Sequence, residues 1–383
     1  MTTKTMTIGP RTMDEMAAFQ KDLDAIRDEA RAKVGEEDAR YIRGILRLVR
    51  ITETLGRGLL LIGWFLPAGI LGAVLLGISK IIDNMELGHN VMHGQFSWMN
   101  DRRFQGDTFE WDNTCPREEW RHSHNYIHHD FTNIIGKDRD FGYGLLRLTS
   151  DLRWSPLHLI QLLLTALLAV LFEWFVAIHD MQLDKAVIGR KPWKSMAPQW
   201  KLVRAKMWRQ IRKDYIGWPL VGAVVGAVFG HAMDGALAVL IGNVVANLIR
   251  NVWAWAIIFC GHFADDIYTF NRDCLNGETK GQWYLRQILG SSNISGGKLL
   301  HLMSGNLSHQ VEHHLYPDLP ANRYAEVAPK VKAVCAKYGI PYNTGAFIPR
   351  LLTVLKRIAR YSLPGGSQTA VRIEVDSILP EKA

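Results

Sequence analysis

The segment GHNVMHG, at residues 88–94, places two histidines four positions apart, directly after a long apolar stretch of the chain. Two later segments repeat the pattern, WRHSHNYIHHDFTN at residues 120–133 and HQVEHHLYP at residues 309–317. Together they hold nine of the fourteen histidines of a 383-residue chain, within windows that span only 19 positions. Chance scatter does not explain such clustering, so the histidines are predicted to act together.

The spacing within each segment indicates what the histidines do. Each segment contains a pair four positions apart, which a helix places on one face about one turn apart. The pairs are His89 with His93, His124 with His128, and His309 with His313. His129 and His314 lie about 100° further round their helices, from which they can reach a second ion. Because many neutral imidazoles packed without metal would be poorly matched as donors and acceptors, the pattern predicts a site for two metal ions.

The residue types narrow the kind of site without selecting the metal. Imidazole nitrogen suits zinc, copper, iron and nickel, but a structural zinc site usually includes cysteine, and the four cysteines stand far apart. A second scheme starts from Glu86 with His89 and Glu119 with His122, since both pairs follow the Glu-x-x-His pattern of soluble two-iron carboxylate sites. That scheme leaves the apolar segments and the third histidine segment unexplained, so we favour an all-histidine site.

Long apolar segments lie between the histidine segments, at residues 59–82, 157–179, 216–233 and 235–260. About 20 apolar residues suffice to cross a hydrocarbon layer about 30 Å thick. Residues 181–214 carry ten Lys or Arg against two Asp, which predicts that this loop faces the cytosol. The net charge of the chain is +8, and its basic residues gather beside the apolar segments. We therefore expect this positive charge to attract the membrane surface, and we predict no nucleic-acid partner.

The three histidine segments must lie on one side of the membrane if they build one site. The hairpin of residues 216–260 satisfies this condition by crossing twice, whereas a single crossing by residues 157–179 violates it. We therefore expect residues 157–179 to lie in the interface, or to dip into the membrane and return. Residues 59–82 are expected to form either one kinked span or a tight hairpin, because glycine and proline interrupt them.

These observations predict an all-α, integral, multi-pass membrane protein whose cytosolic helical cap carries the histidine-rich site for two metals. Residues 1–57 are predicted to form a cytosolic N-terminal helical lead-in, and residues 58–345 the membrane domain with the three histidine segments. Residues 346–383 are predicted to form a C-terminal amphipathic helix and a flexible tail.

At these histidine segments the sequence resembles the membrane fatty acid desaturase family. Residues 88–94 are similar to its first histidine box, HxxxH, residues 120–133 to its second, HxxxHH, and residues 309–317 to its third, HxxHH or QxxHH. The resemblance implies a non-haem centre of two iron ions that activates O2 and removes two hydrogens from an acyl chain, with water as the other product.

The resemblance also implies a set of metal ligands: His89, His93, His124, His128, His129, His262, His309, His313 and His314. His262 corresponds to a ligand that the family places between its second and third boxes. In the third box the four-residue spacing favours His309 over Gln310. Five neighbouring residues are expected to orient the ligands or to be structural: His122, His301, Gln310, Glu86 and Glu312.

The implied reaction needs partners that the chain does not supply. The substrate is a fatty acyl chain linked to CoA, to acyl carrier protein or to a lipid, and two electrons per turnover must come from outside. No GxGxxG dinucleotide fingerprint is present, so we expect a separate ferredoxin or cytochrome b5-like electron donor. Two other functions stay open at this point, a hydroxylase or ketolase on the same scaffold, and a membrane metal transporter.

Overall fold

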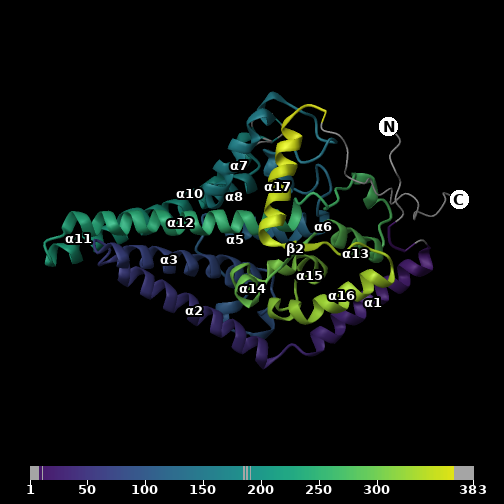
Figure 1. Ribbon diagram of the computed structural model, residues 1–383, viewed down its shortest axis with the longest axis horizontal. Helices are drawn as coiled ribbons and strands as arrows, with labels where there is room; N and C mark the ends of the chain where they lie inside the picture. The colour runs from purple at the N-terminus through teal and green to yellow at the C-terminus, as the bar shows by residue number, and fades with distance from the viewer. Residues whose placement is uncertain (1–7, 11, 184–185, 187–188, 190, 366–383) are drawn as a thin grey trace.

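The computed structural model describes residues 8–10, 12–183, 186, 189 and 191–365. Part of the basic loop and nearly all of the predicted flexible tail therefore lie outside the described residues. The described chain is a wedge of helices (Figure 1). Its narrow end is built by long apolar helices, and its broad end by shorter amphipathic helices and loops.

Two helical hairpins form the narrow end. In the first, α2 (Glu36–Leu60) and α3 (Leu66–Ile82) pack against each other, and in the second α11 (Trp218–Val228) packs against α12 (Ala232–His262). Glycines allow the close approach of the backbones: a Cβ atom at Gly56 would lie 2.7 Å from the backbone N of Leu76. Small residues at helix contacts are typical of membrane proteins. Residues 59–82 thus hold the end of α2, the turn and all of α3, so the hairpin extends back to Glu36 and is not contained within the apolar segment as expected.

Among the described residues two straight helices are long and apolar enough to cross a membrane, Leu66–Met92 and Ala232–His262, each with a mean hydropathy of 1.7. The first of these helices continues ten residues beyond the apolar segment seen in the sequence, so it includes His89, the first histidine of the first pair. Large apolar side chains point outward at the narrow end, where Val228 is 77% exposed and Leu66 is 70% exposed. A water-soluble protein rarely exposes such a continuous apolar surface, so the hydrocarbon layer is its natural environment.

The segment at residues 157–179 is broken. The short turn η6 (Pro156–Ile160) leads into α7 (Gln161–Val170), and α8 (Phe172–Asp180) follows with a bend of 99° between them. Within the described residues it is therefore not a straight crossing helix. A bend of this size fits a broken span as well as a segment that enters the membrane and returns, so the path of residues 157–179 stays a prediction.

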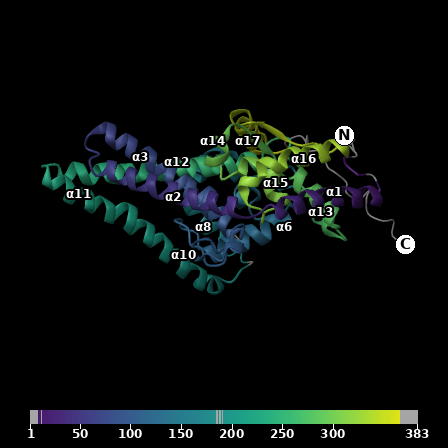
Figure 2. The same ribbon diagram turned by 90° about the horizontal axis from the view of Figure 1, so that it is seen from below.

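The basic segment continues into the second hairpin. Helix α10 (Ala197–Gln210) and the π-helical η8 (Ile211–Gly217) lead without a break into α11. Figure 2 shows α10 diverging from the other helices towards the broad end. The apolar part of this arm, α11, has only 11 residues, so α12 alone of the hairpin meets the length and hydropathy expected of a span.

The two largest hydrophobic cores of the described residues include helices of the broad end. Helix α1 (Met13–Ala32) packs against α13 (Lys280–Leu289) and α16 (Tyr324–Lys337). Helix α17 (Phe347–Ser362) packs against α7 and α12 at the base of the apolar helices. Strands β1 (Asn293–Ser295) and β2 (Thr344–Ala346) pair in parallel between these cores.

Short helical turns carry the histidines. The π-helical η1 (Asp83–His89) and α4 (Asn90–Met92) extend α3, while η4 (Arg121–His128), also π-helical, joins α5 (Arg117–Trp120) to α6 (His129–Phe131). Helix α15 (Gln310–Leu315) follows the 3-10 turn η10 (Leu307–His309). π-Helical turns are rare and frequently mark functional sites. The remaining elements are η2 (Ser97–Met99), η3 (Arg102–Phe104), η5 (Phe141–Gly144), η7 (Trp193–Met196), η9 (Arg272–Leu275), α14 (Lys298–Met303) and η11 (Ala321–Arg323).

Candidate metal centre

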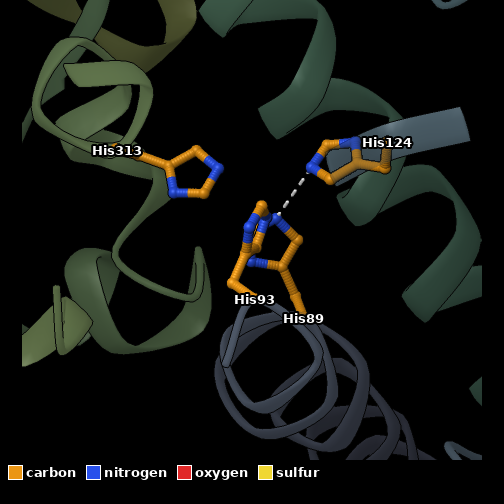
Figure 3. A group of neighbouring side chains, drawn as sticks. All are labelled: His89, His93, His124 and His313. Atoms are coloured by element: carbon orange, nitrogen blue, oxygen red, sulfur yellow. Dashed lines mark hydrogen bonds between the residues drawn. The ribbon is translucent and has the colours of Figure 1, made fainter. Parts of the chain in front are cut away.

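Histidines from all three sequence segments meet at the base of the apolar helices. Figure 3 shows the first group, in which His89 and His93 from the end of the first span face His124 of η4 and His313 of α15. One ring nitrogen of each lies within 4.8 Å of the others. The Nε2 atoms of His89 and His124 are 3.2 Å apart. Segments more than 200 residues apart in the chain thus converge on one point.

A second group lies beside the first and consists of His128, His262 and His314. The Nε2 atom of His262 is 3.3 Å from that of His128 and 3.2 Å from that of His314. His262 is the last residue of α12, so the second long apolar helix ends at this group as the first ends at the other. The chain therefore offers two adjacent sets of nitrogen ligands.

His129 lies between the two groups. Its ring stacks on His314 at a centroid distance of 4.4 Å and meets the rings of His93 and His313 edge-on at 4.8 and 4.7 Å. Both ring nitrogens of His129 are buried, and neither has a hydrogen-bond partner among the described residues. Its ring therefore contacts members of both groups.

The donor set fits metal ions rather than a hydrogen-bonded core. The Nε2 atoms of His93 and His313 are, like those of His129, buried without a partner in the described part of the chain. Buried polar atoms are rarely left unsatisfied. Two imidazole nitrogens bound to one ion at about 2.1 Å, at right angles, lie about 3 Å apart. The nitrogen separations of 3.2 and 3.3 Å match that spacing.

Outer partners hold the rings with Nε2 directed inward. The Nδ1 atom of His128 is 3.1 Å from the Asp138 carboxylate, and that of His314 is 3.0 Å from Oε1 of Gln287. Further Nδ1 contacts reach Asn90 from His89 (3.0 Å), Tyr324 from His313 (3.3 Å), and the carbonyl of Gly290 from His262 (3.4 Å). Such contacts fix the tautomer and orientation of metal-binding imidazoles.

Burial keeps most of these imidazoles neutral, the state in which they bind metal. Burial, followed by repulsion from the neighbouring imidazoles, places the pKa of His93, His129 and His313 well below its ordinary value. His128 differs, because burial alone would lower its pKa but the Asp138 carboxylate outweighs that effect and raises it. An anionic partner of this kind also makes the imidazole a stronger ligand.

The structure does not bring His309 to either group. Its ring stacks on His301 at 4.7 Å, and burial lowers its pKa to about 4. Gln310, and not His309, lies beside the second histidine group, with its side-chain amide Nε2 2.9 Å from Nε2 of His262. The four-residue spacing assumes that both histidines share one helix, whereas His309, at φ −102° and ψ 55°, precedes the helix, which begins at Gln310.

The other predicted neighbours have separate partners. Glu86 is buried and accepts hydrogen bonds from Tyr41 and Asn306, while Glu312 accepts them from Asn293 and Tyr342. His301 contacts the Ser308 hydroxyl, and His122 is exposed. Glu119 accepts a hydrogen bond from Gln199. Among the described residues neither Glu86 nor Glu119 lies in a group of potential ligands, so the carboxylate scheme lacks the geometry it needs.

Several residues of the site were not found from the sequence. Asp140 forms a further group of possible ligands with His124 and His128, and the Asp138 carboxylate contacts Nδ1 of His128. Both follow the second histidine segment within twelve residues, so an Asp-x-Asp pattern beside the histidines was a usable signal. Gln287 and Tyr324 lie far from the segments they contact, and no local pattern marked them.

A cavity of about 80 Å³ borders the centre. His89, His124 and His128 line one end, and Arg250 with Glu173 line the other. The lining follows α12 from His262 to Arg250, twelve residues or about 18 Å along the helix. Between these ends the wall is mainly apolar, with Tyr143, Phe172, Val176, Ala254, Ile258 and Phe263. A lining that follows α12 and is mainly apolar suits an elongated apolar ligand.

The fold and the site define a helical membrane protein with a histidine-rich centre, whose grouped side chains could hold metal, at the base of its apolar helices. The model of the family described as fatty acid desaturase matches residues 63–346. The chain belongs to the fatty acid desaturase family. It is an oxidoreductase that desaturates a fatty acyl chain carried by CoA or a lipid.

Individual relatives agree with this membership. An NADPH-dependent stearoyl-CoA 9-desaturase of Mycobacterium tuberculosis is 45% identical over 344 residues, which cover 90% of this chain and 79% of that protein. An sn-1 linoleoyl-lipid 6-desaturase of Synechocystis is 25% identical over 282 residues, or 72% of this chain and 76% of that protein. Fatty acid desaturase 3 of Bos taurus is 34% identical over 130 residues, which cover 34% of this chain and 27% of that protein.

Proposed function

We propose that this protein is an O2-dependent acyl-CoA desaturase with two iron ions. The observation that carries the proposal is the convergence of two adjacent sets of inward-facing Nε2 atoms beside one narrow cavity. The similarity to the stearoyl-CoA 9-desaturase supports CoA as the carrier and a position near the middle of the chain for the double bond.

The geometry supports one division of the ligands. His89, His93, His124 and His313 would hold one ion, and His128, His262 and His314, with Gln310 beside them, the other. His129 lies between the two sets. The position of His309 does not support its predicted role as a ligand.

Removal of hydrogen from an unactivated methylene group is beyond any amino acid side chain, and iron with O2 supplies the required oxidant. The overall reaction consumes one O2, two electrons and two protons, and it yields the alkene and two waters. The protein's own part is to hold the imidazoles through Asp138, Gln287 and Tyr324, and to exclude water. The apolar wall around Phe172 and Ile258 aligns the acyl chain along α12.

The electrons would come from a separate ferredoxin or cytochrome b5-like protein. The relative from Mycobacterium is named as NADPH-dependent, whereas this sequence has no dinucleotide fingerprint. A reductase that uses NADPH, together with a small electron carrier, would connect the two observations.

The membrane arrangement that fits this function has the centre on the cytosolic face. Both long apolar helices end at the histidines, and the 99° bend between α7 and α8 allows residues 157–179 to re-emerge on the side they entered. Labelling of single cysteines tests this arrangement. A cysteine at Gly230, at the tip of the second hairpin, should react only from outside sealed spheroplasts, and one at Lys201 only after lysis. Equal reactivity of both from outside contradicts the proposed topology.

Product analysis tests the chemistry. Expression in a bacterial host, with mass spectrometry of its fatty acids, should show a product two mass units lighter than the saturated chain. A matched His313→Ala variant should give none, while iron analysis of purified protein should find two ions per chain. A gain of sixteen mass units in the product would indicate hydroxylation instead, and zinc without iron would contradict the proposed cofactor.

A further inference from the structure

Glu86 is completely buried, three residues before His89, and the proposed reaction does not use it. Three side chains donate hydrogen bonds to its carboxyl group: the Tyr41 hydroxyl at 2.7 Å, Asn306 at 2.9 Å and Asn90 at 3.3 Å. Burial of a carboxyl group costs free energy that hydrogen bonds must offset. A network built around such a group, next to a proposed metal ligand, therefore indicates a role.

Asn90 connects this network to His89. Its amide Nδ2 donates to the backbone carbonyl oxygens of Glu86 and Gly305, at 2.9 and 3.3 Å, besides its contact with the Glu86 side chain. These acceptors fix the orientation of the amide, because a flipped amide would turn Oδ1 towards other oxygens. Oδ1 of Asn90 consequently lies 3.0 Å from Nδ1 of His89, and Nε2 of His89 faces His124 (Figure 3).

The same network fastens the turn that precedes the third histidine segment onto the first. Asn306 of this turn donates to Oε2 of Glu86. Gly305 and Asn306 have φ angles of 68° and 55°, and a Cβ atom at Gly305 would overlap the backbone carbonyl of Met85. Only glycine allows so close an approach with this backbone conformation. The contact therefore sets where the third segment, which carries His313, begins.

Tyr41 adds helix α2 to the network. Its hydroxyl oxygen lies 3.3 Å from Nδ2 of Asn306, besides donating to Oε1 of Glu86. Tyr41 stands before residue 63, where the match to the family model begins, so the family match assigns it no role. One hydroxyl from the lead-in region thus contacts both the first segment and the turn before the third.

We propose that Tyr41, Glu86 and Asn306 form a positioning unit for the first metal-binding group. Tyr41 and Asn306 hold the Glu86 carboxyl, Glu86 and its backbone hold Asn90, and Asn90 holds the ring of His89. None of the three residues is a ligand in this scheme. The lead-in helix α2 is then a part of the metal centre and not only a connection to the membrane domain.

The second metal-binding group is oriented by other partners, namely Asp138, Gln287 and the carbonyl of Gly290. The positioning unit is therefore expected to act on the first ion and not on the second. A residue that merely supports the fold would affect both ions alike. This inference rests on the proposed function, and in particular on the proposed division of the ligands between two ions.

Titration with cobalt(II) tests the unit without turnover. Metal-free, full-length protein in detergent is titrated without oxygen, and visible absorption with chelator competition gives the affinity of each binding step. His93→Ala and His262→Ala each remove a proposed ligand from one group, so the step that each variant loses identifies the group. The two ions can then be followed separately in every other variant.

Tyr41→Phe removes only a hydroxyl, and Glu86→Gln keeps the size of the side chain but replaces an acceptor oxygen with a donor. Each should weaken the first group's binding step about tenfold, the low end of the usual effect of a partner outside the ligands, and leave the second step unchanged. Tyr338→Phe is the matched control, because its hydroxyl also donates to a carboxylate, that of Asp22 at 3.0 Å, beside α1. This control should leave both steps unchanged.

Asn306→Gly disturbs the unit from the side of the third segment. Glycine readily keeps the positive φ of this position, so the substitution removes the amide without straining the backbone. The first binding step should again weaken. Tyr41→Phe combined with Asn306→Gly should lose less affinity than the product of the two single losses, because both residues act through Glu86.

Unchanged binding of the first ion in Tyr41→Phe and Glu86→Gln overturns the proposal. An equal loss at both steps also overturns it, since that result would indicate general support of the fold. A wild type that binds fewer than two cobalt ions contradicts the proposed function and the positioning unit with it. A wild type that binds two ions but desaturates no acyl chain counts against the proposed reaction alone, because binding is measured without it.

Discussion

The Nδ1 atom of His128 lies 3.1 Å from Oδ1 of Asp138, and this contact turns Nε2 of His128 towards His262. The same carboxylate accepts the backbone N–H groups of Asn133 and Asp140, which anchor it in the loop that follows the second histidine segment. A proposed ligand, its orienting carboxylate and the wall of the proposed substrate cavity are therefore parts of one short stretch of chain.

Asp138→Asn should weaken metal binding without removing a ligand. The amide keeps the size of the side chain but loses the charge that orients and strengthens His128, and loss of such a partner typically costs about 10- to 100-fold in metal affinity. Iron titration followed by competition with a chelator measures the change. An affinity equal to that of the wild type would contradict the role assigned to Asp138, and Asp130→Asn, an exposed neighbour, is the control.

Substitutions in the third histidine segment should distinguish His309 from Gln310. His309→Ala should leave the iron content near that of the wild type, because the ring stacks on His301 outside both ligand groups. His313→Ala should lower the iron content markedly, and Gln310→Ala should lower it less. Elemental analysis of purified protein gives these values directly, and loss of an ion from His309→Ala would restore His309 as a ligand.

The sequence predicted the helical class and the convergence of the histidines because both depend on local patterns, apolar length and four-residue spacing. The sequence also favoured His309 as a ligand through its spacing from His313, but the backbone leaves helical geometry at His309, a change that side-chain spacing does not reveal. It also missed Gln287 and Tyr324, whose roles depend on packing between segments far apart in the chain. Contacts between distant segments leave no repeating pattern in the sequence from which they could be predicted.

Asp38→Asn should destabilise the broad end by about 1–3 kcal/mol, the cost of disturbing a buried, charge-assisted hydrogen-bond network. Asp38 is buried, pairs with Arg323 at 2.7 Å, and accepts hydrogen bonds from Asn322 and the backbone N–H of Gly35. Denaturant unfolding of detergent-solubilised protein at neutral pH measures the loss. An unchanged midpoint would show that this pair contributes nothing to stability.

The same residue predicts a dependence on pH. Burial alone would raise the pKa of Asp38, but Arg323 and the two neutral donors outweigh it, and the pKa is lowered from 3.8. The carboxylate therefore stabilises the fold above the unfolded-state pKa of 3.8, and this contribution is lost as the pH falls through the folded-state value. The stability difference between wild type and Asp38→Asn should narrow on acidification, and a difference that widens would contradict this assignment.

Arg250 and Glu173 form an ion pair at the far end of the cavity, between α12 and α8, and both side chains are almost completely buried. Arg250→Met alone should destabilise the protein by about 3–5 kcal/mol, because it leaves the Glu173 charge buried without its partner. The double variant Arg250→Met with Glu173→Met should recover most of this loss, since replacement of a whole buried pair by apolar side chains is often neutral or stabilising.

Thermal unfolding in one detergent, for the wild type, both single variants and the double variant, gives the coupling between the two positions. Recovery in the double variant with unchanged desaturation would identify the pair as a structural link between α8 and α12. Recovery of stability with a shift in the preferred chain length would instead show that the pair sets the end of the acyl cavity. A double variant as unstable as Arg250→Met would contradict the pairing, because the cost would then come from lost packing of the arginine itself.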